Sequence, residues 1–216
     1  TGVFFINADR EYKEGKNQNM LRPEDVEKIS YVYLNKRKIE KYSRFVSKED
    51  LKKENYNCNI RRYVDNTPPT ENQDVYAHLH GGIPVKEVDD LNLFTNCYGN
   101  IAEAVFEKQN EKYMNFVKDI STKDDIKTKL FDYADYKKTR TEYDSILKDF
   151  WKLACKEISM LPETQDVYDL QKKLTSMFSE NLAEKQNPVL DEYQSRGAFA
   201  QYLEDLKFEF KSIASS

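Results

Sequence analysis

The side chains with the clearest chemical potential are basic and amide groups in the first third of the chain. Between Arg10 and Arg62 there are 15 Lys or Arg and 9 Asp or Glu residues, a net charge of +6. Lys and Arg neutralise phosphates, and Asn and Gln amides bond to phosphate, sugar or base edges. The sequence therefore favours a nucleic-acid interface, whose candidate residues are Arg10, Lys16, Asn17, Asn19, Arg22, Arg61 and Arg62.

A simpler interpretation of the same residues stays open. The segment Gly15–Asn19 is typical of a polar turn. Residues 59–65 alternate around Ile60 and Val64, a pattern that also fits a surface strand whose arginines pair with carboxylates. Tyr56 and Tyr63 would add stacking surfaces to an interface with nucleic acid.

Signatures of catalysis or metal binding are missing from the sequence. It has no Gly-x-Gly-x-x-Gly, no phosphate-binding Gly-Lys-Ser/Thr loop and no Ser or Cys nucleophile motif. His78 and His80 would share a face on a strand, but no third metal ligand accompanies them. Cys58, Cys97 and Cys155 form no Cys-x-x-Cys pair, so we expect reduced, buried thiols.

Short elements separated by turns are expected to carry the basic residues. An apolar strand is predicted at Val3–Ile6. Pro23 is placed for the first turn of a helix, and the Ser47–Asp50 segment resembles a capping box that opens a second short helix.

The chain from Leu93 to Ser216 has a net charge of −4, from 18 Lys or Arg and 22 Asp or Glu, and is predicted to be helical. Apolar residues recur every three or four positions, and each such stripe needs a partner surface. Helices are predicted around Ile101–Asp119 and Thr122–Tyr136, and three further stripes follow: Tyr143 to Ile158, ended by Pro162; Val167 to Leu182; and Phe199 to Ile213.

The composition excludes several classes of protein. The chain has 216 residues, 39% hydrophobic and 13% aromatic, a net charge of −4, and only 6 Gly and 6 Pro, which argues against a disordered, collagen-like or strongly basic chain. The longest apolar run, Val3–Ile6, falls far short of the ~20 residues of a membrane helix. We expect a soluble, cytoplasmic protein without membrane contact, and a fragment of a larger protein, because a strand follows Thr1 almost at once.

Four blocks carry a resemblance to a known family. They are Val3–Ala8, Gly15–Asn19, Asn55–Asp65 and His80–Pro84, and together they resemble the final part of the modification (M) subunit of type I restriction-modification systems. The segment Leu190–Tyr193 and the aromatic-rich helix after it are similar to the helical C-terminal region of longer family members.

This resemblance implies an adenine-N6 DNA methyltransferase that uses S-adenosylmethionine and flips its target base. Its partners would be DNA, a specificity subunit, a second M subunit and a restriction subunit. The family's Asn/Asp-Pro-Pro-Tyr/Phe motif is missing here, since neither Thr67–Thr70 nor Asn187-Pro188 supplies its groups, and the glycine-rich cofactor loop is missing too. We therefore expect this chain to hold no cofactor and to be inactive alone.

The predicted fold is mainly α: a helical bundle or layered helical array, preceded by one orphan strand and a turn-rich connector. Residues 1–92 would be the end of the methyltransferase domain with its basic connector, and residues 93–216 a helical C-terminal domain. The chain would supply surface for a DNA cleft and for subunit docking. The alternative is a helical protein-interaction adaptor without DNA contact.

Overall fold

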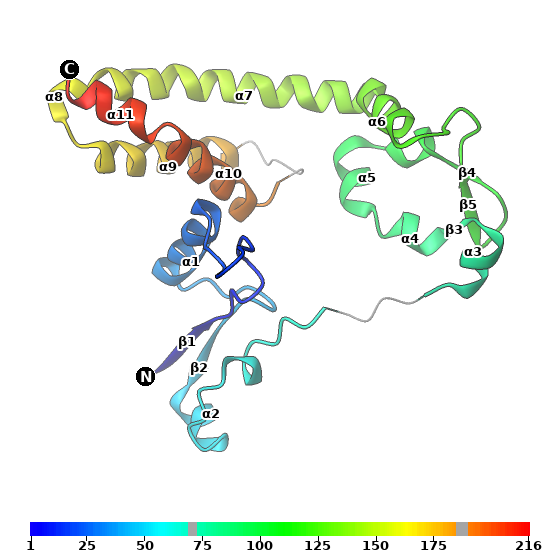
Figure 1. Cartoon of the computed structure of the whole chain (residues 1–216), viewed down its shortest axis with the longest axis horizontal. Coiled ribbons are helices and arrows are strands. Elements are labelled where there is room, and N and C mark those ends of the chain that lie inside the picture. Colours follow the sequence, from blue (N-terminus) through cyan, green and yellow to red (C-terminus); the bar gives the residue numbers. More distant parts are fainter. Residues whose placement is uncertain (69–72, 185–189) are drawn as a thin grey trace. The chain divides into compact units, whose positions relative to one another are not determined.

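The computed structural model describes residues 1–68, 73–184 and 190–216. The fold is mainly helical, as predicted, with small antiparallel sheets (Figure 1). Contacts group the chain into two compact units, and each is described by itself. Unit 1 comprises Thr1–Thr70, Glu157–Ser179 and Glu192–Ser216, and unit 2 comprises Glu71–Lys156 and Glu180–Asp191. The proposed division into a methyltransferase end and a helical domain at residue 92 stays a prediction.

The N-terminal strand of unit 1 has a partner. Strand β1 (Gly2–Ile6) pairs antiparallel with β2 (Ser43–Ser47), and Phe4 lies opposite Phe45. The expectation of an orphan strand is therefore wrong in this respect. Strand β2 escaped prediction because its two apolar residues, Phe45 and Val46, are adjacent and give no alternation.

A small core lies against one face of this ribbon. It contains Phe5, Val46, Leu51 and Val64, and Tyr63 stacks on Phe5 with ring centres 4.7 Å apart. Leu51 belongs to α2 (Lys48–Lys53), whose predicted capping is confirmed: the Ser47 hydroxyl accepts a hydrogen bond from the Asp50 amide at 3.1 Å.

The segment predicted as a possible surface strand is instead a turn of 3-10 helix, η1 (Ile60–Arg62). The Asn59 side chain accepts a hydrogen bond from the Arg61 amide at 3.1 Å and so caps this turn. Local hydrogen bonding of this kind competes with a strand, and the alternation of apolar residues could not reveal it.

The first long helix, α1 (Pro23–Asn35), begins at the predicted proline and packs against α10 (Glu192–Asp205) within unit 1 (Figure 1). The helix α9 (Val167–Glu184) confirms the second predicted stripe, and its Phe178 stacks on Phe199 of α10 at 4.2 Å.

The third stripe is divided between two helices. Helix α10 ends at Asp205 and α11 (Lys207–Ala214) follows, with the break at Leu206. The apolar spacing continues across the break, so the sequence pattern predicted one helix. Helix α11 also packs against the short α8 (Leu161–Thr164).

Unit 2 contains most of α7 (Ala134–Ser159), which confirms the predicted stripe and ends before Pro162. The predicted helix at Thr122–Tyr136 is present in its first part as α6 (Lys123–Asp132). Unit 2 also contains α3 (Val75–His80), β3 (Ile83–Pro84), α4 (Val85–Asp89), α5 (Asn92–Tyr98) and η2 (Ile101–Ala104).

The predicted helix around Ile101–Asp119 is wrong after η2, because β4 (Phe106–Lys108) and β5 (Tyr113–Phe116) form a hairpin there. The strand order of this sheet is β3-β5-β4. Asn110 makes the turn, since its side-chain oxygen accepts from the Lys112 and Tyr113 amides at 2.8 and 3.0 Å. In the described parts of the chain, no helix is both long and apolar enough to span a bilayer.

Candidate nucleic-acid interface

Residues 14–19 form a closed loop, here called the amide loop, which contains three of the predicted site residues. Lys13 and Met20 close it with two backbone hydrogen bonds of 2.8 and 3.0 Å. Gly15 is needed there, since a Cβ at this position would lie 2.4 Å from the Gln18 carbonyl oxygen. Lys16, Asn17 and Asn19 are exposed. The polar turn predicted from the sequence therefore exists, and it presents amides and a lysine to solvent.

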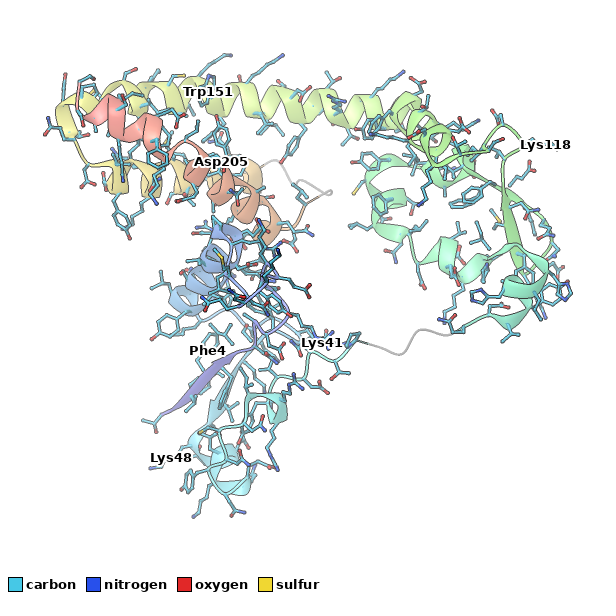
Figure 2. All side chains as sticks on the ribbon, in the orientation of Figure 1. Phe4, Lys41, Lys48, Lys118, Trp151 and Asp205 are labelled. Carbon is cyan, nitrogen blue, oxygen red and sulfur yellow. The ribbon has the colours of Figure 1, made fainter. Side chains whose placement is uncertain are left out.

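Arg10 lies just before this loop and is also exposed. Within the described chain, neither Arg10 nor Lys16 forms an ion pair. Exposed lysines also lie near the ends of β2, at Lys41 and Lys48 (Figure 2). These positive charges are available to an external anion.

Arg22 has a structural role at the start of α1. Its Nε and Nη2 donate to the two Asp25 carboxylate oxygens at 3.0 and 2.9 Å, and its backbone amide donates to Oδ2 at 2.8 Å. Its Nη1 pairs with Glu24 at 2.8 Å. Asp25 is only 3% exposed, and the hydrogen bonds from Arg22 lower the pKa of its carboxyl group. These bonds fix the end of the segment that carries the amide loop.

A second set of contacts fixes the other end of that segment. Lys28 of α1 forms an ion pair with Glu11, and its ammonium lies 4.1 Å from the ring centre of Tyr42. Burial raises the pKa of the Tyr42 hydroxyl, and the negative charge of Glu11 adds to the effect. Glu11 and Arg22 thus attach both sides of the amide loop to α1.

Arg61 and Arg62 pair with carboxylates, as the simpler interpretation predicted, although they lie on a 3-10 turn. Arg61 Nη2 donates to Asp9 Oδ2 at 3.0 Å, and Arg62 Nη1 donates to Glu54 Oε2 at 2.7 Å. The arginine side chains remain 72% and 52% exposed. Exposed pairs of this kind stabilise little and exchange partners readily.

The Asp9 carboxylate interacts with both Arg10 and Arg61. The carboxylate is hydrogen-bonded to Asn66 and to Arg61, and these bonds, followed by the charges of Arg61 and Arg10, lower its pKa. The buried Asn7 donates to the Val64 carbonyl at 2.9 Å and joins the two segments. This role of Asn7 was not predicted from the sequence, because its position directly after an apolar strand is the only feature that sets it apart.

The segment that contains the amide loop is similar to known proteins. Residues 1–72 match the family model described as N-6 DNA Methylase. This segment is similar to N-6 DNA methylases. The resemblance predicted from the sequence is therefore confirmed for the first third of the chain, and residues 1–72 are here called the methylase segment.

The curated relatives that match are methylase subunits of type I restriction enzymes. The MjaVII subunit of Methanocaldococcus jannaschii is 38% identical over 76 residues, which is 34% of this chain and 13% of the relative. The MpnII subunit of Mycoplasma pneumoniae is 26% identical over 78 residues, which is 36% of this chain and 14% of the relative. The chain thus spans a small part of the length of these relatives. No solved structure matches the chain.

All seven predicted nucleic-acid residues lie in the methylase segment. The structure brings Arg10 and Arg61 together around Asp9 and places Lys16, Asn17 and Asn19 in the amide loop. Arg22 is occupied by Asp25 and Glu24, and Arg62 by Glu54. The exposed residues without ion pairs, rather than the whole set, are therefore the strongest candidates for contact with an anion.

The two histidines considered as metal ligands lie outside the methylase segment and have other neighbours. His78 and His80 lie on α3, not on a strand; His78 Nε2 lies 3.0 Å from Gln73 Oε1, and the His80 ring packs on Tyr76 at 4.5 Å. Among the described residues, no three His, Cys, Asp or Glu side chains gather as metal ligands.

The prediction of buried cysteines is wrong, since Cys58 and Cys155 are exposed and Cys97 is only half-buried. Cys58 lies in the loop between α2 and η1, and Cys155 lies on α7. Part of Thr67–Thr70, from residue 69, and all of Asn187-Pro188 lie outside the described residues.

Proposed function

We propose that this chain is part of the methylase (M) subunit of a type I restriction-modification system and that its methylase segment contacts DNA. The match to N-6 DNA methylases supports the first statement. The exposed amide loop, fixed at both ends, supports the second. Lysine and arginine without internal partners bind phosphates, and amides next to them can bond to sugar or base edges.

The intact protein would transfer a methyl group from S-adenosylmethionine to adenine N6 in DNA, by family likeness. The described residues do not fit the cofactor's binding loop. Gly81 and Gly82 follow helix α3 and precede strand β3, the reverse of the strand-to-helix order in which glycine-rich cofactor loops occur. We therefore assign no residue of this chain to the cofactor or to methyl transfer.

The helices after residue 93 would provide the docking surface for other subunits. Large apolar side chains are exposed on three of them: Trp151 on α7 (labelled in Figure 2), Tyr168 on α9 and Phe208 on α11, at 46, 79 and 78%. Trp151 belongs to unit 2 and the other two to unit 1, so each unit would offer its own contacts to a partner. The specificity subunit, a second M subunit and the restriction subunit are the partners expected from the family likeness, in the cytoplasm.

The test of DNA contact is a mobility-shift titration of this chain with duplex DNA. We expect Arg10→Ala/Lys16→Ala to weaken binding by about tenfold, since two phosphate contacts are lost. The matched control is Lys118→Ala/Arg140→Ala, which removes the same charges from exposed positions in unit 2. If both double variants weaken binding equally, only net charge matters and the amide-loop interface is disproved.

A further inference from the structure

Arg196 of α10 is bonded to two other helices of unit 1. Its Nε donates to Glu27 Oε1 of α1 at 2.8 Å, and its Nη2 pairs with the same carboxylate. Its Nη1 donates to the Ser179 hydroxyl of α9 at 2.7 Å. Its guanidinium carbon lies 4.1 Å from the ring centre of Tyr31, again on α1. One side chain thus uses its charge, its donors and its planar face at once.

The ion pair between Arg196 and Glu27 is largely protected from solvent. The arginine and Glu27 side chains are 14 and 23% exposed. Tyr31 also bonds to Glu192 and packs edge-on against Tyr193, with ring centres 6.1 Å apart. Two guanidinium nitrogens of Arg196 thus bond one oxygen of Glu27, and charge-assisted hydrogen bonds of this kind are stronger than those between neutral groups.

Gly197 allows the two helix backbones to approach each other. A Cβ at this position would lie 3.0 Å from the Glu24 Cβ and 3.6 Å from its Cα. The glycine is buried, so a larger side chain would have to displace Glu24 or the α1 backbone. The arginine bonds and the glycine contact lie next to each other on α10 and both meet the first half of α1.

Residues in the same half of α1 also bond to the chain on both sides of the amide loop. Asp25 binds Arg22 after the loop, and Lys28 binds Glu11 before it. These residues alternate along α1 with Glu24, Glu27 and Tyr31, which contact α10. Helix α1 therefore contacts both the segment that carries the loop and α10.

We propose that Arg196 is a positioning residue for DNA contact. It fixes α1 against α9 and α10, and α1 in turn fixes the amide loop. This inference rests on the proposed function and adds to it a role for α10, which lies outside the methylase segment. Lysine cannot replace the arginine, because one ammonium cannot bond Glu27 twice, reach Ser179 and stack on Tyr31.

The experiment compares the wild-type chain with Arg196→Ala, Arg196→Lys and the control Lys211→Ala. Lys211 is exposed on α11 and forms no ion pair within the described residues, so its loss changes only the net charge. Two quantities are measured: amide hydrogen exchange of residues 23–35 without DNA, and affinity for duplex DNA as a function of salt.

We expect both Arg196 variants to exchange faster than wild type in α1 and to bind DNA about five- to tenfold more weakly, with a shallower salt dependence. Lys211→Ala should leave exchange unchanged and affinity within about twofold. If Arg196→Ala loses its circular dichroism, Arg196→Lys decides the result alone, since it keeps the charge and the helix.

Two results would overturn the inference, and they differ. If wild type binds DNA with salt-dependent affinity and Arg196→Lys binds as tightly, the positioning role is wrong while the proposed function stands. If wild type has no affinity for DNA, the proposed function fails and the inference fails with it. Restored affinity in Glu27→Arg/Arg196→Glu, relative to Arg196→Glu alone, would support the role directly.

Discussion

At the scale of residues, the side chains predicted to contact nucleic acid differ in whether the folded chain gives them an ion-pair partner. Arg22, Arg61 and Arg62 are bonded to carboxylates, and Arg10 and Lys16 form no ion pair within the described chain. Residue type alone could not show this difference, because the partners of Arg61 and Arg22 depend on the folded chain. Contact of Arg61 and Arg62 with DNA stays a prediction.

Asp25 gives a pH-dependent test of the anchor at the start of α1. The hydrogen bonds of Arg22 lower its pKa below the ordinary value of 3.8. Its stabilising effect is therefore fully present above about pH 4 and is lost as the pH falls through the lowered pKa. We expect Asp25→Asn to reduce the free energy of unfolding by about 1 kcal/mol at pH 7, since Arg22 is partly exposed.

The measurement is urea unfolding of wild type and Asp25→Asn at pH 7 and at pH 3. The difference between the two proteins should shrink at pH 3, because below the ordinary carboxyl pKa the unfolded chain takes up a proton that the folded carboxylate resists. Asp144→Asn is the control, since this carboxylate is exposed on α7 and forms no ion pair among the described residues. A difference for Asp25→Asn that is the same at both pH values would contradict the role of its charge.

At the scale of elements, the sequence predicted those whose signals are local. Pro23 and Ser47 mark the starts of α1 and α2, and the stripes of α7 and α9 need only their own residues. Strands β2, β4 and β5 have three to five residues and no continuous apolar run like that of β1, so no local pattern marked them as strands. Their pairing depends on segments that no local pattern contains.

The packing of α1 on α10 is testable through Gly197. We expect Gly197→Leu to destabilise unit 1 by about 1–3 kcal/mol, since the new side chain must enter the space against Glu24. Leucine raises helix propensity relative to glycine, so a loss of stability can come only from the contact.

Ala198→Leu is the matched control, since this neighbouring residue of α10 is exposed. Thermal unfolding followed by circular dichroism should show a lower midpoint for Gly197→Leu and an unchanged or higher midpoint for Ala198→Leu. Equal midpoints for the two variants would mean that α10 does not approach α1 closely at this point.

At the scale of the whole molecule, the methylase segment and the C-terminal helices share unit 1. The ion pair of Arg196 and Glu27 joins residues 169 positions apart in the chain. No sequence pattern could predict this pair, because neither residue belongs to a motif and each has many equivalents on the helix surfaces. The family resemblance pointed to the front of the chain, the family model bounded the methylase segment at residue 72, and the structure added its attachment to α10.

The central claim is that this chain contacts DNA through its methylase segment, and the salt dependence of binding tests it most directly. The logarithm of the binding constant for a short DNA duplex is measured against the logarithm of the salt concentration. We predict a linear fall with a slope of about −2 or steeper, as several phosphates are neutralised. A slope near zero, together with salt-insensitive binding to a protein partner, would contradict the claim and favour a helical adaptor.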